Sequence, residues 1–166
     1  VELEPLPGDA PDQTIIKVNV EEQATGTINF GGGFSTFEGL LTDFGIRENN
    51  LLGRGQVLRL NASISTRRQL IDLGFTEPYL FDRDLAGSAD IFRRSTDFRQ
   101  ESSFDQEEVG FNVGAGYSIT EELRHSVRYI IRRDLIKNVN DDASRIIKEQ
   151  EGASVVSAVG HTLALD

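Results

Sequence analysis

Side chains that could carry chemistry are sparse in this sequence, and their spacing matches none of the common catalytic or metal-binding patterns. The chain contains no cysteine, which excludes a thiolate metal site, a cysteine nucleophile and a disulfide scaffold. Its two histidines, His125 and His161, do not form a His-x-x-x-His pair, so we expect structural or exposed roles for them rather than zinc binding. No Gly-x-Ser-x-Gly segment offers a strained nucleophilic serine. These patterns identify no catalytic residue and predict no metal or cofactor, although composition does not exclude a Ser/His/Asp triad.

Two further patterns resemble ligand sites but depart from them at decisive positions. Residues 138–149 follow the spacing of an EF-hand calcium loop, yet Asn138 stands at its first position and Ala143 at its sixth, where the sharp turn needs glycine. The glycine-rich residues 31–33 and 53–55 are not followed by Gly-Lys-Ser/Thr, so they are not phosphate-binding loops. We expect a solvated acidic loop at 138–149.

Composition narrows the class of protein. The 166 residues carry 17 Lys+Arg against 27 Asp+Glu, a formal charge of −10, which argues against a nucleic-acid partner. With 38% hydrophobic residues, the chain is not expected to be disordered. The length suits one medium domain or part of a larger one. Because the sequence contains no methionine, Val1 is not a translation start, and we expect a processed or excised piece.

The elements that position these residues are indicated by a two-residue alternation of apolar and polar side chains, which is typical of β-strands. Eight segments show it: 24–35, 40–47, 58–65, 71–76, 87–91, 109–117, 123–132 and 154–165. Successive strands with few helical segments between them favour antiparallel hairpins. One short, exposed helix is expected within 144–150. The predicted fold class is therefore all-β, an antiparallel meander of about eight strands.

The alternation leaves open which face of the sheet is covered. The polar face carries charges of both signs: Asp43, Arg47, Arg59, Asp72, Asp90, Arg124, Arg128 and Arg132. A soluble sandwich would turn the apolar face inward, whereas a membrane barrel would turn it toward lipid. Two features favour the membrane barrel, although the absence of tryptophan weakens the second. Several strands approach ten residues, and aromatic residues gather near strand ends, at Phe34, Phe37, Tyr79, Phe81, Phe98, Phe104 and Tyr117.

Three arginine pairs, at residues 67–68, 93–94 and 132–133, also fall near the ends of expected strands. Contact with the phosphates of lipid head groups is one interpretation. A solvated rim is the other.

The first 23 residues differ from the rest. Residues 1–4 and 14–20 suggest a short hairpin with Pro7, Gly8 and Pro11 at its tip, and alternate apolar residues predict a half-buried face formed by Ile16, Val18 and Val20. Because two strands alone are marginally stable, we interpret this hairpin as the end of a preceding domain, with a boundary near residues 22–24.

Three segments together resemble one family. VNVEEQATGTINFGGGFSTFEGLLTDFGIRENNLLGRGQ (residues 18–56) is similar to the junction between the last POTRA domain and the barrel in the BamA family of outer-membrane β-barrel assembly factors. FTEPYLFDRDLAGSADIFRR (75–94) resembles that family's Thr-Glu-Pro-Tyr turn and the strand after it, and GYSITEELRHSVRYIIRRD (116–134) resembles its next hairpin. The likeness covers nearly the whole chain, and the order and spacing of the segments make it specific.

The resemblance implies a sixteen-stranded transmembrane barrel, with residues 1–23 as the C-terminal end of a POTRA domain and residues 24–166 as strands one to eight. It implies that the protein is not an enzyme and that it assembles and inserts β-barrel proteins, with the first strand as a lateral-gate template for client strands. The implied pairing residues are Thr25, Gly26, Thr27, Ile28, Asn29, Phe30, Gly31, Gly32, Gly33 and Phe34. Implied partners are outer-membrane protein clients, accessory lipoproteins bound through the POTRA region and the bilayer, with the N-terminal tail in the periplasm.

Two other functions remain open at this point. One is a self-contained eight-strand barrel that serves as a structural protein or a small-ligand carrier, since eight strands can close a small barrel. The other is a translocation barrel from a sister family with the same architecture and different clients.

Overall fold

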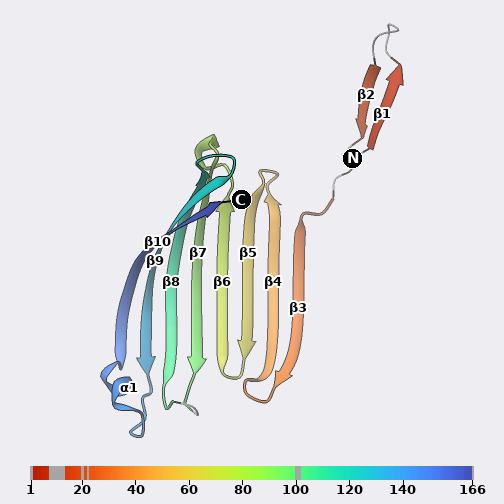
Figure 1. Cartoon of the computed structure of the whole chain (residues 1–166). Helices are drawn as coiled ribbons and strands as arrows, with labels where there is room; N and C mark the ends of the chain where they lie inside the picture. The colour runs from red at the N-terminus through yellow and green to blue at the C-terminus, as the bar shows by residue number, and fades with distance from the viewer. Residues whose placement is uncertain (1, 8–13, 20, 22, 100–101, 166) are drawn as a thin grey trace.

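The computed structural model describes residues 2–7, 14–19, 21, 23–99 and 102–165. Within them the chain forms two antiparallel sheets: a two-stranded hairpin, β1–β2, and an eight-stranded sheet in the order β10-β9-β8-β7-β6-β5-β4-β3 (Figure 1). The small sheet contains β1 (Glu2–Pro7) and β2 (Thr14–Asn19). The large sheet contains β3 (Gly26–Ser35), β4 (Gly39–Leu51), β5 (Gln56–Ser65), β6 (Arg68–Glu77), β7 (Leu85–Asp97), β8 (Asp105–Ser118), β9 (Leu123–Lys137) and β10 (Gly152–Leu165).

The eight strands predicted from the alternation are confirmed, and every hydrogen-bonded neighbour is also a neighbour in sequence. Several strands extend beyond the alternating segment. β7 continues through Arg93 and Arg94 because these arginines form ion pairs with Glu107 and Glu108 on β8, which keeps charged residues within the ladder. Cross-strand pairs of opposite charge stabilise a sheet without any alternation of hydropathy.

The connections alternate between the two ends of the sheet. The turn of residues 36–38, the turn of residues 66–67 and the loop of residues 98–104 lie at one end, together with the segment that contains helix α1 (Arg145–Glu149). The turns at 52–55 and 119–122 lie at the other end, with the 3-10 turn η1 (Leu80–Asp82) (Figure 1). Ser144 caps α1 by accepting a hydrogen bond from the Ile147 backbone N–H, and α1 is exposed as predicted. Within the described ranges, no helix is long and apolar enough to cross a membrane.

The strand register separates two faces. We define the apolar face by the row Ile28, Ile46, Leu60, Leu73, Ile91, Phe111 and Ile131, whose members are successive cross-strand partners. We define the polar face by the adjacent row Asn29, Gly45, Asn61, Asp72, Phe92, Gly110 and Arg132. The apolar face is uncovered: Ile28 is 73% exposed and Phe30 is 78% exposed. Of the described hydrophobic residues, only Phe92 and Ala143 are buried, and Phe92 lies on the polar face. A soluble sandwich would bury the apolar face, so the arrangement agrees with a sheet whose apolar face meets lipid.

The sheet is open. β3 and β10 occupy its two edges and do not pair with each other in the described part of the chain. The chain by itself is therefore not a closed eight-strand barrel.

The N-terminal hairpin differs in two respects from its prediction. β1 continues through Pro5 to Pro7, where a loop was expected, because an edge strand tolerates the missing proline N–H. The apolar face of β2 was expected to be half-buried, yet Ile16 is 64% exposed and Val18 is also exposed. Figure 1 shows the physical reason, since the hairpin stands away from the large sheet. Gly8, Pro11 and Val20 lie outside the described residues.

Candidate functional site: an open strand edge beside a polar face

The first strand of the large sheet has one paired edge. β3 pairs with β4 in unbroken register from Gly26 opposite Glu48 to Ser35 opposite Gly39. No described strand pairs with its other edge. Backbone N–H and C=O groups that point to an open edge lack ladder partners, and such an edge is a template for another strand.

The structure places the predicted pairing residues together on this strand. Gly26 to Phe34 all lie within β3, and Thr25 directly precedes it. The carbonyl oxygen of Thr25 accepts hydrogen bonds from the backbone N–H of Asn49 at 3.3 Å and from its side-chain Nδ2 at 3.0 Å, and the Thr25 hydroxyl donates to Glu48. These bonds anchor the start of β3 to β4.

The central glycines of β3, Gly31 and Gly32, are not needed to avoid a clash with any described residue, because a side chain at either position would find space. A Cβ atom added at Gly31 would have the Asp43 Cβ atom at 3.8 Å as its nearest neighbour, and one added at Gly32 would have the Leu41 carbonyl oxygen at 3.8 Å. These are ordinary van der Waals distances. At Gly110, by contrast, a Cβ atom would overlap the Phe92 ring. Relief of crowding explains Gly110 but not Gly31 or Gly32.

The polar face next to β3 contains an ion-pair network that the sequence did not predict. Arg59 on β5 contacts Asp72 Oδ1 on β6 through Nε at 3.2 Å and Asp90 Oδ1 on β7 through Nη2 at 3.0 Å. Asn61 Nδ2 also donates to Asp72 Oδ1 at 3.2 Å. Arg59 can cross β6 because its partner there is Gly74, where a Cβ atom would lie 2.5 Å from Asp90 Oδ1 and 2.8 Å from Arg59 Nη2. The signal in the sequence is Arg, Gly and Asp at matching positions of three successive strands.

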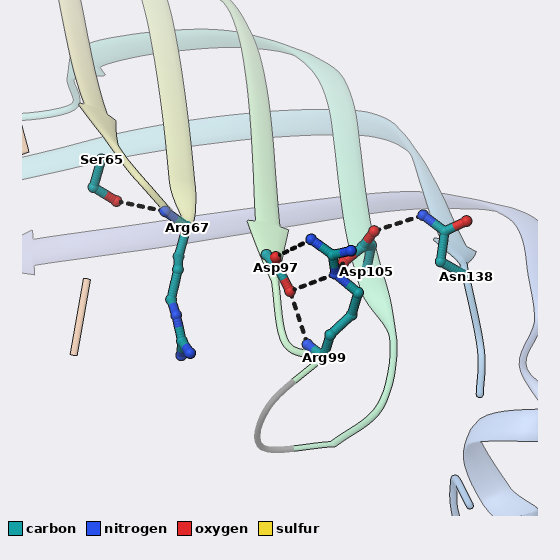
Figure 2. A network of polar contacts seen from close by, with 6 residues as sticks. All are labelled: Ser65, Arg67, Asp97, Arg99, Asp105 and Asn138. Atoms are coloured by element: carbon teal, nitrogen blue, oxygen red, sulfur yellow. Dashed lines mark hydrogen bonds and ion pairs between the residues drawn. The ribbon is translucent and has the colours of Figure 1, made fainter. Parts of the chain in front are cut away.

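A second network lies at the end of the sheet opposite the start of β3 (Figure 2). Arg99, in the loop after β7, contacts Asp97 Oδ2 through Nη2 at 2.5 Å and Asp105 Oδ1 through Nε at 3.3 Å. Asn138 Nδ2, after β9, donates to Asp105 Oδ2 at 2.6 Å. The hydrogen bond and charge of Asp97, with the charge of Asp105, raise the pKa of the Arg99 guanidinium above its ordinary value. The network joins β7, β8 and β9 at their loop ends.

The side chains of the two patterns that resembled metal sites contact other residues. Asn138 contacts Asp105, and α1 occupies most of the second half of the EF-hand-like segment. The rings of His125 and His161 are 5.7 Å apart, and His125 Nδ1 lies 3.0 Å from the Tyr117 hydroxyl. Among the described side chains, no group of three His, Asp or Glu residues is placed to hold a metal ion.

Comparisons with known proteins agree with this architecture. The chain is similar to the outer membrane protein assembly factor BamA of Nitratidesulfovibrio vulgaris, with 32% identity over 97% of this chain. It is also similar to that of Neorickettsia risticii, with 28% identity over 92% of this chain. The chain spans about a fifth of the length of these two curated relatives.

A solved structure shows the same fold. The crystal structure of BamA from Haemophilus ducreyi lacking POTRA domains 1–3 superposes with a TM-score of 0.65 at 24% identity, over 98% of this chain and 33% of that one. The model of the Omp85 superfamily domain matches residues 50–166. Because that match covers well over half of the residues, the chain belongs to the Omp85 superfamily.

Proposed function

We propose that this chain takes part in the assembly and insertion of β-barrel proteins into the bacterial outer membrane, and that β3 is the strand on which a client strand is templated. The observation that carries the proposal is that β3, one of the two edge strands of the eight-stranded sheet, has central glycines, Gly31 and Gly32, that no described neighbour crowds. Relatives named as outer membrane protein assembly factors supply the context. The mechanism is non-enzymatic, with no catalytic residue, metal or cofactor.

The unpaired backbone N–H and C=O groups at the open edge of β3 are the groups that would pair with a client strand. In lipid hydrocarbon, each unpaired backbone N–H or C=O group costs several kcal/mol. A client strand that pairs with Gly26–Ser35 removes this cost from both strands at once, by β-augmentation. Folding and lipid burial of the client supply the free energy. β3 supplies the pattern of donors and acceptors.

The glycines of β3 make the edge adaptable. Gly31, Gly32 and Gly33 carry no side chain that would fix the packing of a partner, and glycine weakens a strand interior. A glycine-rich strand also specifies register weakly, which suits clients of differing sequence. Since crowding against this chain does not account for Gly31 or Gly32, weak and exchangeable pairing is the role we assign to them.

The two faces of the sheet support a membrane-spanning position. The exposed apolar face suits contact with hydrocarbon, and the charged polar face suits a wet lumen. Aromatic residues lie near both ends of the strands, with Phe34 and Phe98 at one end and Tyr79 and Tyr117 at the other. Such bands are typical of the two membrane interfaces. The bilayer is therefore a partner, and no nucleic acid is expected.

We assign residues 1–23 to the end of a periplasmic POTRA domain and residues 24–166 to the first half of the barrel. In support, β1 and β2 form a sheet of their own, apart from the large sheet (Figure 1). The end of the sheet where β3 begins then faces the periplasm. Accessory lipoproteins would bind through the POTRA region.

Crosslinking in the full-length protein tests the template role. Asn29 on β3 and Asn61 on β5 lie in one cross-strand row through Gly45, but Asn61 sits between two paired neighbours. We expect Asn29→Cys and Thr27→Cys to form adducts with a stalled client that carries cysteines in its terminal strand, and the matched control Asn61→Cys to form none.

A complete absence of adducts along Gly26–Ser35 would remove the template role. Adducts with a substrate that crosses the membrane without inserting would instead favour a translocation barrel.

A further inference from the structure

We propose that the apolar face carries a binding site for a phosphorylated glycolipid of the outer leaflet, formed by Arg93, Arg133 and Lys137 beside an apolar groove. The proposal rests on the proposed function for its orientation, because that orientation places this end of the sheet at the outer leaflet.

Each of two neighbouring arginine pairs sends one side chain to each face. Arg93 on β7 and Arg133 on β9 are both cross-strand partners of Val109 on β8, so they belong to the apolar face. Their neighbours Arg94 and Arg132 belong to the polar face. With strands about 4.8 Å apart, the two outward arginines begin about 10 Å from each other across Val109. That spacing lets two long side chains converge on one anion.

The positive charge on the apolar face is only partly compensated. Arg93 Nη2 lies 2.6 Å from Glu107 Oε1, and Lys137 Nζ lies 3.0 Å from Glu107 Oε2. Arg133 makes no ion pair with any described residue and is exposed. Arg93 and Lys137 thus share the Glu107 carboxylate, and Asp105, the cross-strand partner of Lys137, contacts Arg99. Arg133 is therefore left as an uncompensated positive charge in a chain of net charge −10. On a face that meets lipid, such a charge calls for an anionic partner.

A shallow apolar groove lies beside Arg133, and Arg93 is the cross-strand partner of Val109 in its wall. The groove has a volume of about 330 Å³ and is lined by Ile91, Val109, Phe111, Ile131 and Val155, together with Gly110, Arg132 and Arg133. An acyl chain can pack against the apolar residues that line the groove, and a phosphate can form ion pairs with the cations. A soluble anion would leave the groove unused, and a neutral lipid would leave the cations unpaired. An acylated phosphate lipid uses both.

The position along the strands agrees with a head group. β9 has 15 residues, more than the roughly 9–11 that cross the hydrocarbon core. Arg133 follows the outward-facing Val127, Tyr129 and Ile131, so it stands where the apolar run ends and the loop end of the strand begins. Long cationic side chains at this depth extend toward the interface. Because the hairpin end of the sheet faces the periplasm in our proposal, the source is the phosphorylated glycolipid rather than a phospholipid of the inner leaflet.

Lipid binding by the full-length protein in neutral detergent tests this site by native mass spectrometry. The probes are lipid A, phosphatidylglycerol and phosphatidylcholine. We expect R93Q/R133Q to bind lipid A about thirtyfold more weakly than wild type, since each of the two cations near a membrane surface contributes about 1 kcal/mol. R93K/R133K, which keeps both charges, is expected to retain binding and to show that the sites tolerate substitution.

The matched control is R94Q/R132Q, which removes the same charge one residue away, on the face where Arg94 contacts Glu108 and Arg132 contacts Asp134. We expect it to bind lipid A like wild type. Unchanged binding by R93Q/R133Q, an equal loss in R94Q/R132Q, or equal affinity of wild type for phosphatidylglycerol would each overturn the proposal. No client takes part in the measurement, so failure of this site and failure of client templating are recorded separately.

Discussion

Arg59 links three strands through a gap left by Gly74. The glycine on β6 leaves room for the guanidinium to reach Asp90 on β7 while Nε remains 3.2 Å from Asp72. The side chains of Asp72 and Asp90 are 23% and 22% exposed, so water screens the pairs only in part. The ion pairs of Arg59 connect β5 to β6 and β7 on the wall of the proposed lumen, and we call this connection the cross-strand tie.

Removing the guanidinium tests this tie. Arg59→Gln leaves two carboxylates on neighbouring strands without their cation, and we expect the free energy of unfolding to fall by about 1 kcal/mol. Denaturant titration in detergent measures it. Arg47→Gln is the matched control, since Arg47 lies in the same row but its Nε contacts only Asn49, at 2.7 Å. Equal losses in both variants would contradict the tie.

At the scale of residues, the sequence predicted the sheet face on which each charged side chain lies, but not the residue with which it forms an ion pair. The alternation placed Arg59, Asp72 and Asp90 on one polar face. Which of them meet depends on the register, and the register depends on turn lengths and bulges that hydropathy does not report. Phe92 illustrates the limit: it follows Ile91 in an apolar run, yet it is buried on the polar face over Gly110.

Among the elements, β3 has one paired edge and two central glycines, Gly31 and Gly32, that sterics do not require, whereas a Cβ atom at Gly33 would lie 3.0 Å from Leu41 Cδ1. On the interior strand β8, Gly110 leaves the space that the Phe92 ring occupies. Gly31 and Gly32 are therefore the residues on which the role assigned to β3 rests.

Stiffening β3 tests that role. Gly32→Val adds β-propensity worth about 1 kcal/mol, which we expect to strengthen β3–β4 pairing and to slow client insertion about fivefold. Insertion of a client barrel into liposomes by the full-length protein measures the rate. Gly160→Val on β10 is the control, because a Cβ atom there would meet no atom within 4 Å and, as at Gly32, would not clash. Unchanged insertion by Gly32→Val, or equal slowing by both variants, would count against exchangeable pairing at β3.

Element order could be predicted from the sequence, but element ends could not. The alternation predicted all eight strands and the short helix, because a half-covered strand enforces a two-residue period. It ended one strand at Ile91, whereas β7 continues to Asp97. Beyond Ile91 the ladder is maintained by ion pairs with β8, and such pairs are visible only once the register is known.

For the whole molecule, the decisive property is that a single open sheet has one apolar and one charged face. No described element covers the apolar face, and the charged face carries the Arg59 network. The sequence could not settle which face is covered, because a sandwich and a membrane barrel share one alternation. The exposure of Ile28 and Phe30, together with the match to the Omp85 superfamily domain, favours the membrane barrel. An inward-facing ligand carrier would show the opposite arrangement.

Collision accessibility of spin labels in the full-length protein, reconstituted in liposomes, tests the outward direction of the apolar face most directly. Two adjacent pairs of small residues provide matched sites: Ala62 and Ser63 on β5, and Ser88 and Ala89 on β7. Ala62 and Ala89 belong to the apolar face, and Ser63 and Ser88 belong to the polar face. We predict that labels at Ala62 and Ala89 collide with oxygen dissolved in the lipid, and that labels at Ser63 and Ser88 collide with a water-soluble nickel reagent. The reversed pattern, or no alternation between neighbours, would contradict the account.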